Sequence, residues 1–245
     1  MIGLIVHRII ETNSTNNYAV TEMLTKRLSE GTVIVADSQI DGKGQGTNKW
    51  ESEPGKNLTF SIVLYPDFLE VSRQFKLSKA ISLGVADFLS RFTDGVTIKW
   101  PNDIYIGNRK VAGILIENSI RLNKISTCIA GIGLNVNQQV FVSDAPNPVS
   151  LSQITGKDYD LRDILTGVCL NIDARHQMLL SGAFSQSDED YAGALYLQGI
   201  WATYSDEKGE FEGRILGVDQ IGRLQIETGS GKVNCYHFKE VEFRR

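Results

Sequence analysis

The stretch 98-IKWPNDIYIGNRKVAGILIEN-118 contains two β-rich runs on either side of Gly107-Asn108. Glycine and asparagine tolerate the backbone of a tight turn, so this pattern predicts a β-hairpin. The hairpin is the best-defined local feature of the chain, and other strand and helix patterns lie on both sides of it.

Apolar runs and alternating patterns predict further strands at 4–10, 33–36, 58–64 and 125–136. Apolar residues at helical spacing predict helices over 20–28, 75–92 and 161–179. The strand at 58–64 alternates as expected for a strand with one buried face. After about residue 200, short β runs and turns predict a small all-β module of roughly fifty residues. A module of that size is expected to lean on the larger part of the chain.

The motif 99-KWPND-103 precedes the hairpin, and it has an ordinary structural explanation. Trp100 would pack inside, Pro101 would end a strand, and the next two residues would turn the chain. Lys110, at the start of the second hairpin strand, would by the same reasoning be a solvated charge on a strand edge. This explanation leaves the concentration of hydrogen-bonding side chains unexplained.

A glycine-rich loop, 41-DGKGQGTNKW-50, lies between two predicted strands. It does not match a dinucleotide-binding fingerprint, which leads into a helix, and the chain has no GxxxxGK[ST] motif. On glycine spacing alone, a mobile turn and a ligand-binding loop are equally good interpretations. Lys43 and Lys49 bracket the glycines and Trp50 offers an aromatic face, which favours an anionic ligand that carries a flat ring.

Composition limits the class of protein. A 42% hydrophobic content is sufficient for a core, and a net charge of -4 gives no basic field for nucleic acid or an anionic membrane. Cys128, Cys169 and Cys235 are far apart and form no CxxC pair, which predicts reduced thiols in the core. With no signal-peptide core and no apolar run of membrane length, we expect a soluble cytoplasmic protein.

Five motifs occur in the order ETNSTN, GKGQGTNKW, KWPND, RKVAGIL and GIGLNVN between Glu11 and Asn137. Together they resemble the biotin–protein ligase family, also called biotin–[acetyl-CoA-carboxylase] ligase, in its short form without an N-terminal DNA-binding domain. KWPND followed by a KxxGIL strand is the most specific part. Residues 213–231 are similar to the family's small SH3-like domain.

The resemblance implies an α+β fold with a mixed β-sheet and flanking helices, shared with lipoate-protein ligases, plus a small C-terminal SH3-like β-barrel. It implies a catalytic domain over residues 1–197 and an SH3-like domain over 198–245. The implied activity is ATP-dependent activation of biotin as biotinyl-5′-AMP, followed by transfer to a lysine of a biotin carboxyl carrier domain. ATP and Mg²⁺ are the expected cofactors, with biotin as substrate.

The resemblance also assigns site residues by motif position. Lys110 matches the family's active-site lysine, whose ammonium would reduce the repulsion between a carboxylate and a triphosphate. Biotin-binding positions are Ser14, Thr15, Asn16, Gln39, Gly42, Lys43, Gly44, Gln45, Lys110 and Gly113. ATP-binding positions are Lys43, Gln45, Asn48, Trp50, Asn102, Lys110 and Asn135. No protein ligand for a metal is implied, and Asp103 is expected to brace the turn.

The glycine loop is the least faithful match, because the family's common loop reads GRGRxGRxW. Lys43 lacks the arginine fork, and Gln45 and Asn48 are uncharged, so either the adenylate is held less tightly or Lys49 compensates. An acyl-adenylate must be kept from water, and glycines let backbone amides approach a ligand. We therefore expect the loop to be open without biotin and ordered with it.

Other functions stay open at this point. A lipoate or octanoate ligase would share the fold, but KWPND and the C-terminal β module favour biotin. A non-catalytic carrier-binding module is disfavoured by the joint presence of Lys110, Asn102 and Asn135. No basic recognition helix precedes Glu11, so DNA binding is not expected. The expected partner is the carrier domain of a biotin-dependent carboxylase. Homodimers are common in the family, and for a homodimer of this chain an exposed sheet edge is the expected surface.

Overall fold

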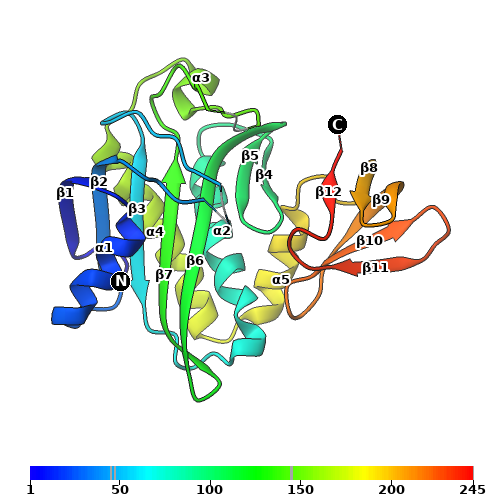
Figure 1. Cartoon of the computed structure of the whole chain (residues 1–245), viewed down its shortest axis with the longest axis horizontal. Coiled ribbons are helices and arrows are strands. Elements are labelled where there is room, and N and C mark those ends of the chain that lie inside the picture. The colour runs from blue at the N-terminus through cyan, green and yellow to red at the C-terminus, as the bar shows by residue number, and fades with distance from the viewer. Residues whose placement is uncertain (45, 47, 144–145, 245) are drawn as a thin grey trace.

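The computed structural model describes residues 1–44, 46, 48–143 and 146–244, which fold around two β-sheets (Figure 1). The larger is a seven-stranded mixed sheet with strand order β1-β2-β3-β7-β6-β5-β4. Its strands are β1 (Val6–Thr12), β2 (Val33–Gln39), β3 (Leu58–Leu64), β4 (Val96–Lys99), β5 (Asp103–Ile106), β6 (Arg109–Arg121) and β7 (Lys124–Leu134). Together with the flanking helices and a second, C-terminal sheet, it confirms the predicted α+β fold class.

Strand pairing in the larger sheet brings the site residues together. β1 and β2 run parallel, whereas the other neighbouring strands run antiparallel. The predicted hairpin is confirmed, since β5 and β6 are joined by a turn at Gly107-Asn108. On β7, Gly131 pairs with Ser61 of β3 on one side and with Leu115 of β6 on the other.

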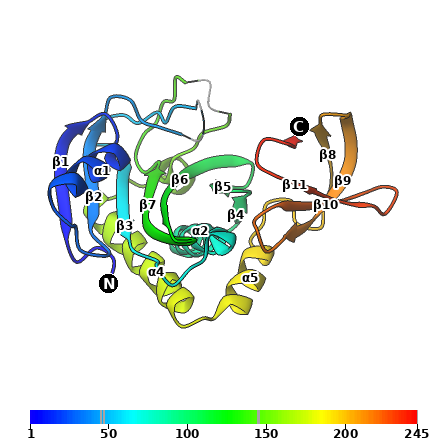
Figure 2. The same ribbon diagram turned by 60° about the horizontal axis from the view of Figure 1, so that its bottom comes forward.

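β3 is buried along its whole length, so the prediction that only one of its faces is buried is wrong. Phe60 and Ile62 belong to the main core, which is covered by α2 (Phe75–Leu89) and α4 (Leu161–Leu180). Val63 belongs to a second core cluster with Ala19 of α1 (Thr15–Thr25). Figures 1 and 2 show α1 on one face of the sheet and α2 and α4 on the other. A short polar side chain on β3 can therefore face a helix rather than water.

Two helices were not predicted. α3 (Leu151–Thr155) begins at a capping box in which the Ser150 hydroxyl accepts a hydrogen bond from Gln153 N. α5 (Phe184–Gly193) contains the polar stretch 185-SQSDED-190, which conceals the helix because few of its residues are buried. A single turn of 3-10 helix, η1 (Val71–Arg73), precedes α2.

The smaller sheet is antiparallel, with strand order β11-β10-β9-β8-β12. Its strands are β8 (Trp201–Asp206), β9 (Gly209–Val218), β10 (Leu224–Thr228), β11 (Val233–Tyr236) and β12 (Glu242–Phe243). The segment between α5 and β8 pairs first with the larger sheet and then with the smaller one. Tyr196 N donates to Ile98 O of β4, and Gln198 forms a bridge with Ile215 of β9. We propose the division between residues 197 and 198 on this change of partner.

The cysteines differ in their surroundings. Cys128 and Cys169 are buried, as predicted, but Cys235 is exposed, so the prediction of a core thiol is wrong for that residue. Cys235 lies on β11, an edge strand of the smaller sheet, where alternate residues face solvent. Among the described residues, no helix combines the length and apolar character needed to cross a bilayer.

Candidate functional site

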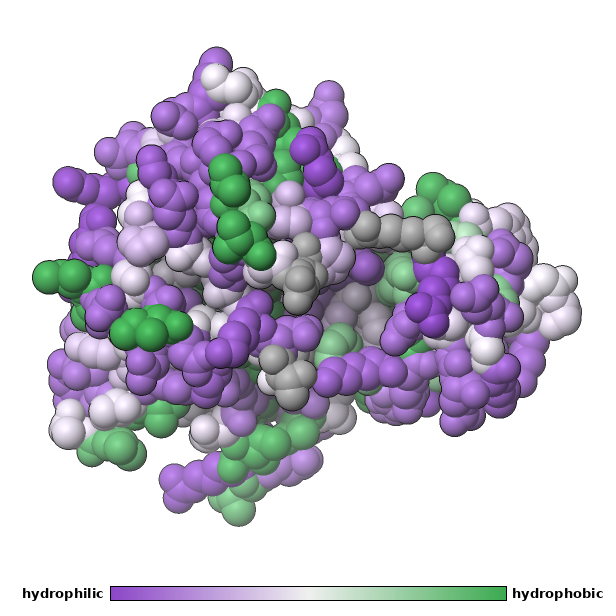
Figure 3. All heavy atoms as spheres, turned by 45° about the horizontal axis from the view of Figure 1, so that its top comes forward, coloured by the Kyte–Doolittle hydropathy of each residue, from purple (hydrophilic) through white to green (hydrophobic). Residues whose placement is uncertain are grey.

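A cavity of about 720 Å³ opens on the face of the larger sheet that carries α1 and extends towards the C-terminal strands. It is lined by Ser14 and the first two residues of α1, the glycine loop, the KWPND turn, β6, β7 and most of the segment 238–243. Figure 3 shows that the surface in this view is mostly hydrophilic, with hydrophobic side chains in separate patches. Hydrophilic residues therefore make up most of this face of the molecule.

One end of the cavity is built where α1 meets the centre of the sheet. Ser61 Oγ lies 2.7 Å from Thr15 Oγ1 and 2.6 Å from Asn16 Oδ1. The Asn16 amide nitrogen donates to Glu117 Oε2 at 2.7 Å, and Thr15 N donates to Gln39 Oε1 at 2.8 Å. Buried polar groups in such a network hold fixed orientations. This end can present oriented donors and acceptors to a small polar ligand.

Gly131 forms the floor beneath Asn16. A Cβ atom at position 131 would lie 2.5 Å from Asn16 Oδ1, closer than non-bonded atoms approach. The strand pairing places Gly131 between Ser61 and Leu115, so the missing side chain creates the space in which Asn16 sits. The glycine is required here for close approach rather than for backbone freedom.

Lys110 lines the cavity from the start of β6. Its ammonium lies 2.8 Å from Asp103 Oδ1 and 5.7 Å from the centroid of the Trp50 ring. The Lys110 backbone is also fixed, because its N–H donates to Asn147 O and its carbonyl accepts from Val149 N. Lys110 is thus held on both its main chain and its side chain, with a positive charge directed into the cavity.

The Trp50 indole ring lies across two glycines of the sheet. A Cβ atom at Gly113 would be 3.1 Å from Trp50 Cζ3, and one at Gly133 would collide with the same ring. The indole Nε1 is buried without a hydrogen-bond partner among the described residues. A buried donor without a partner is costly, so a ligand acceptor at this point would be stabilised.

The described residues of the glycine loop form a narrow ladder over the cavity. Lys43 and Lys49 form a backbone bridge, and Gly44 N donates to Asn48 O at 2.8 Å. The Lys43 ammonium donates to Asn17 Oδ1 at 3.1 Å, and Lys49 pairs with Asp41. The loop therefore brings a lysine side chain and backbone amides to the mouth of the cavity. Gln45 lies outside the described residues.

Three predicted residues have mainly structural contacts. Gly42 is not in the lining: its carbonyl accepts from Trp50 N, and a Cβ atom there would lie 2.6 Å from Trp50 O. Asn135 is also outside the lining, buried with its amide nitrogen donating to Val149 O at 3.2 Å. Asn102 does line the cavity, and its amide donates to Ile114 O.

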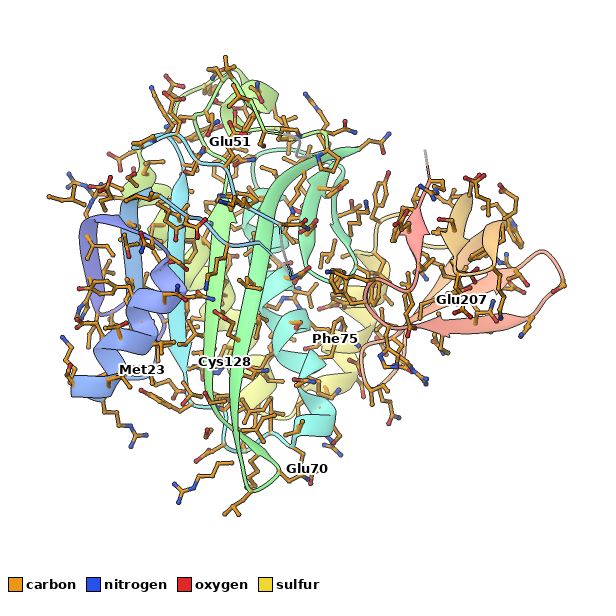
Figure 4. All side chains as sticks on the ribbon, viewed as in Figure 1. Met23, Glu51, Glu70, Phe75, Cys128 and Glu207 are labelled. Atoms are coloured by element: carbon orange, nitrogen blue, oxygen red, sulfur yellow. The ribbon has the colours of Figure 1, made fainter. Side chains whose placement is uncertain are left out.

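Sequence reasoning missed a partly exposed hydrogen-bond network behind the loop. The Glu51 carboxylate accepts from Val142 N at 2.9 Å, from Ser143 N at 2.8 Å and from Gln138 Nε2 at 3.1 Å. Burial opposes ionisation of Glu51, but these hydrogen bonds outweigh it and lower the carboxyl pKa. Figure 4 places Glu51 at the end of the sheet near α3. The network links the residue after Trp50 to the chain that follows β7.

Sequence reasoning also missed a set of cavity-lining residues at the C-terminal end of the chain. We call these residues the C-terminal wall. They are Phe238, Lys239, Val241, Glu242 and Phe243. The ring of Phe238 lies 6.3 Å from that of Trp100, whose indole donates to Gly222 O at 2.9 Å. The only sequence signal for this wall was the general expectation that the small β module leans on the larger part.

The structure brings most of the predicted residues into one cavity. Eight predicted biotin-binding residues line it: Ser14, Thr15, Asn16, Gln39, Lys43, Gly44, Lys110 and Gly113. Five predicted ATP-binding residues line it: Lys43, Asn48, Trp50, Asn102 and Lys110. Their binding roles remain predictions, because co-location shows only that one ligand could reach them.

Comparison with known proteins places this arrangement in a family. The sequence model of the Biotin/lipoate A/B protein ligase family matches residues 8–137, from β1 through the end of β7 and the asparagines that follow it. The chain belongs to the biotin/lipoate A/B protein ligase family. The matched region contains α1, the glycine loop, KWPND and Lys110, so it carries every site residue except the C-terminal wall.

Relatives within the family match far beyond this region. The chain is 32% identical over 244 residues to the bifunctional ligase/repressor BirA of Bacillus subtilis, covering 95% of this chain and 72% of that protein. It is 27% identical to the biotin–[acetyl-CoA-carboxylase] ligase of Paracoccus denitrificans, covering 91% and 95% of the two chains. The structure is similar to the Aquifex aeolicus biotin protein ligase in complex with biotin and ATP, with a TM-score of 0.81, 28% identity and 99% of both chains covered.

Proposed function

We propose that this protein is an ATP-dependent biotin–protein ligase, that is, a biotin–[acetyl-CoA-carboxylase] ligase. The observation that carries the proposal is Lys110, a cation beside the Trp50 ring that lines the same cavity as the polar cluster at α1. The similarity to named biotin ligases over almost the whole chain supports the same activity and favours biotin over lipoate or octanoate.

In the first step, an oxygen of the biotin carboxylate attacks the α-phosphorus of ATP. A new O–P bond forms, the bond between the α-phosphorus and the β-bridging oxygen breaks, and pyrophosphate leaves with its electron pair. Both reactants are anionic, so the Lys110 ammonium lowers their repulsion and stabilises charge that develops on the transferring phosphoryl group. Asp103 holds that ammonium in position, 2.8 Å away.

We assign the α1 end of the cavity to biotin. Its oriented groups on Thr15 and Asn16 can hydrogen-bond a ureido ring, which offers two donors and one acceptor. Ser14, Gln39 and Gly113 complete this end, and Lys43 and Gly44 cover it from the glycine loop. Gly42 contributes to this end indirectly, because its carbonyl accepts a hydrogen bond from Trp50 N within the glycine loop.

We assign the Trp50 side of the cavity to the nucleotide. The indole offers a flat face for a base, and Asn48 and Asn102 line the same cavity. Asn135 is assigned an indirect part: it fixes the chain at Val149, which in turn pairs with the Lys110 backbone.

The residues present also fit Mg²⁺ that arrives with ATP. Asp103 and Glu242 are the carboxylates in the lining, and the described residues contain no cluster of three metal-ligating side chains. Mg²⁺ bound mainly through phosphates needs only one or two protein carboxylates, which these two residues would supply. When bound, Mg²⁺ would neutralise part of the charge on the phosphates.

In the second step, the amine of a carrier-domain lysine attacks the carbonyl carbon of biotinyl-AMP. An amide bond forms, the bond to the phosphate oxygen breaks, AMP leaves and the amine loses a proton. The carrier domain of a biotin-dependent carboxylase is the proposed partner. A homodimer is a further proposal, with β1 as the free edge of the larger sheet.

The test supplies ATP with biotin, lipoate or octanoate and measures acid-dependent pyrophosphate release. A purified biotin carboxyl carrier domain is then added, and mass spectrometry locates the modified lysine. We expect release with biotin and one modified lysine on the carrier. Release with lipoate or octanoate but not with biotin would assign the other chemistry of the family. Binding of the carrier without release for any acid would indicate a non-catalytic module.

A further inference from the structure

The C-terminal wall closes the end of the cavity opposite α1. Figures 1 and 2 both place β12 and α1 on opposite sides of β6 and β7. The wall is fixed to the larger sheet at two points, since the Phe238 ring packs near Trp100 and the Lys99 ammonium lies 4.8 Å from the centroid of the Phe243 ring. The wall is thus a built part of the cavity.

Lys239 has an unusual backbone within this wall. Its φ of 71° lies in the left-handed region, which residues with a side chain adopt rarely and glycine adopts readily. Backbone strain of this kind concentrates at functional sites. Lys239 therefore holds a long cationic side chain at a backbone position suited to glycine, and its surroundings decide what that side chain can bind.

The Lys239 ammonium reaches across to the glycine loop. A Cβ atom built on Gly46 would lie only 2.6 Å from Lys239 Nζ, so the ammonium sits directly against the loop backbone. Lys239 forms no ion pair with a carboxylate in the part of the chain that the structure describes. A cation without a protein counter-ion at a cavity is available to an anionic ligand.

The charges around the cavity favour an anion. Among the described residues, its lining contains five lysines and two carboxylates, a formal excess of three positive charges. The lysines are Lys43, Lys49, Lys99, Lys110 and Lys239, and the carboxylates are Asp103 and Glu242. Asp103 pairs with Lys110 and Glu242 pairs with Arg244, and neither carboxylate forms an ion pair with Lys239 among the described residues.

We propose that Lys239 binds the β- and γ-phosphates of ATP and the pyrophosphate that leaves. This inference rests on the proposed function. Biotin is assigned to the α1 end, and β6, whose first residues include Lys110, lies between α1 and the C-terminal wall (Figures 1 and 2). In an in-line displacement the leaving group departs on the side opposite the attacking oxygen, which here is the side of Lys239. The C-terminal wall thereby supplies a cation that the glycine loop, with its uncharged Asn48, does not.

The test replaces Lys239 in the full chain and measures ligand binding by calorimetry. Lys239→Gly removes the ammonium and also relieves the left-handed backbone, so a loss of binding cannot be attributed to added strain. Lys239→Arg keeps the charge. Lys232→Ala removes an exposed lysine from the same sheet outside the cavity lining and is the matched control.

We expect Lys239→Gly to raise the dissociation constants of ATP and inorganic pyrophosphate about three- to tenfold, the size of an exposed charge-assisted contact. The dissociation constants of AMP and biotin should stay within twofold. Lys239→Arg should restore most of the loss, and Lys232→Ala should bind as the parent protein does. The effect should shrink as salt is added.

Unchanged pyrophosphate binding in Lys239→Gly would overturn the proposal, as would an equal loss in Lys232→Ala. An equal weakening of AMP and pyrophosphate would place Lys239 at the nucleoside end instead. These binding constants do not depend on turnover. A parent protein that binds pyrophosphate through Lys239 but releases none from ATP and biotin would therefore contradict the proposed function alone.

Discussion

The Lys110 ammonium lies 2.8 Å from the Asp103 carboxylate, and the two residues come from opposite strands of one hairpin, β5 and β6. The hairpin turn thus fixes the distance between the proposed catalytic cation and the group that orients it.

Replacement of Lys110 tests its catalytic role. We expect Lys110→Ala to reduce biotin-dependent pyrophosphate release by about 10²–10³-fold or more, because a charge aimed at the developing phosphoryl charge is lost. Thermal unfolding should change little, since the Lys110 backbone contacts do not need the side chain. Lys124→Ala, at an exposed position at the start of β7, is the control. Turnover near that of the parent protein would remove Lys110 from the mechanism.

Gly131→Ala tests the biotin end of the cavity. The new Cβ atom would displace Asn16, whose Oδ1 would be only 2.5 Å away, and disturb its hydrogen bond with Ser61. We expect the dissociation constant of biotin to rise about tenfold, equivalent to one hydrogen bond, with a smaller change for ATP. Gly193→Ala, where a Cβ atom meets nothing within 4 Å, provides the control. Equal biotin binding by both variants would refute this assignment.

Hydrogen exchange tests the glycine loop as a lid. If residues 41–50 close over biotinyl-AMP, their backbone amides should exchange more slowly when biotin and ATP are present. The Gly44 and Trp50 amides already donate within the loop, so they provide the reference for a closed ladder. Equal protection with and without ligands would contradict closure on binding. Strand β3, buried throughout, should be protected in both states.

Glu51 gives a stability difference that depends on pH. Its carboxyl pKa is lowered from an ordinary value of 4.5, because hydrogen bonds from Ser143, Val142 and Gln138 outweigh the opposing effect of burial. A lowered pKa in the folded state stabilises the protein above the ordinary pKa, and this stabilisation is lost as the pH falls through the folded-state value. We expect Glu51→Gln to lower the free energy of unfolding by about 1–2 kcal/mol at pH 7.

The same comparison at about pH 3 should show a smaller difference, because this is below the ordinary carboxyl pKa of 4.5 and the stabilisation declines as the pH falls from there towards the lowered folded-state pKa. Urea unfolding of both proteins at the two pH values measures it, and Glu207→Gln, in an exposed turn of the smaller sheet, is the matched control (Figure 4). A difference that grows towards acid would contradict the hydrogen-bond arrangement.

Thiol labelling distinguishes the three cysteines. Burial raises the pKa of Cys128 to about 12, and burial together with the nearby Asp173 raises that of Cys169 to about 12. Both thiols are therefore protonated and shielded at pH 8, whereas Cys235 is exposed. We expect one thiol per chain to react rapidly with a disulfide reagent and the other two only after unfolding. Cys235→Ser should abolish the rapid phase.

Local patterns predicted the elements that local physics determines. The Gly107-Asn108 turn, the strand at 33–36 and the long helix α4 were all visible because periodicity and turn chemistry lie within a few residues. α5 was missed because its stretch 185-SQSDED-190 has no apolar stripe. Burial of both faces of β3 was missed because it depends on α1, which is distant in sequence.

The site residues also fall into two groups: those that short motifs predicted and those that depend on contacts between distant parts of the chain. Motif positions located Lys110, Asn16 and the glycine loop, since these residues belong to short patterns with recognisable spacing. Glu51 carries no such signal, because its partners are more than eighty residues away. The C-terminal wall was unpredictable for a similar reason: Lys239 meets Gly46 only when two sheets pack together.

The residues that line the cavity run from Ser14 to Phe243, so the cavity is assembled from residues separated by most of the chain. Domains fold largely in the order of their synthesis, so a nascent polypeptide forms the large sheet before the final strands emerge from the ribosome. We therefore expect adenylation only from finished molecules, so that a half-translated chain would not release a reactive anhydride among its neighbours.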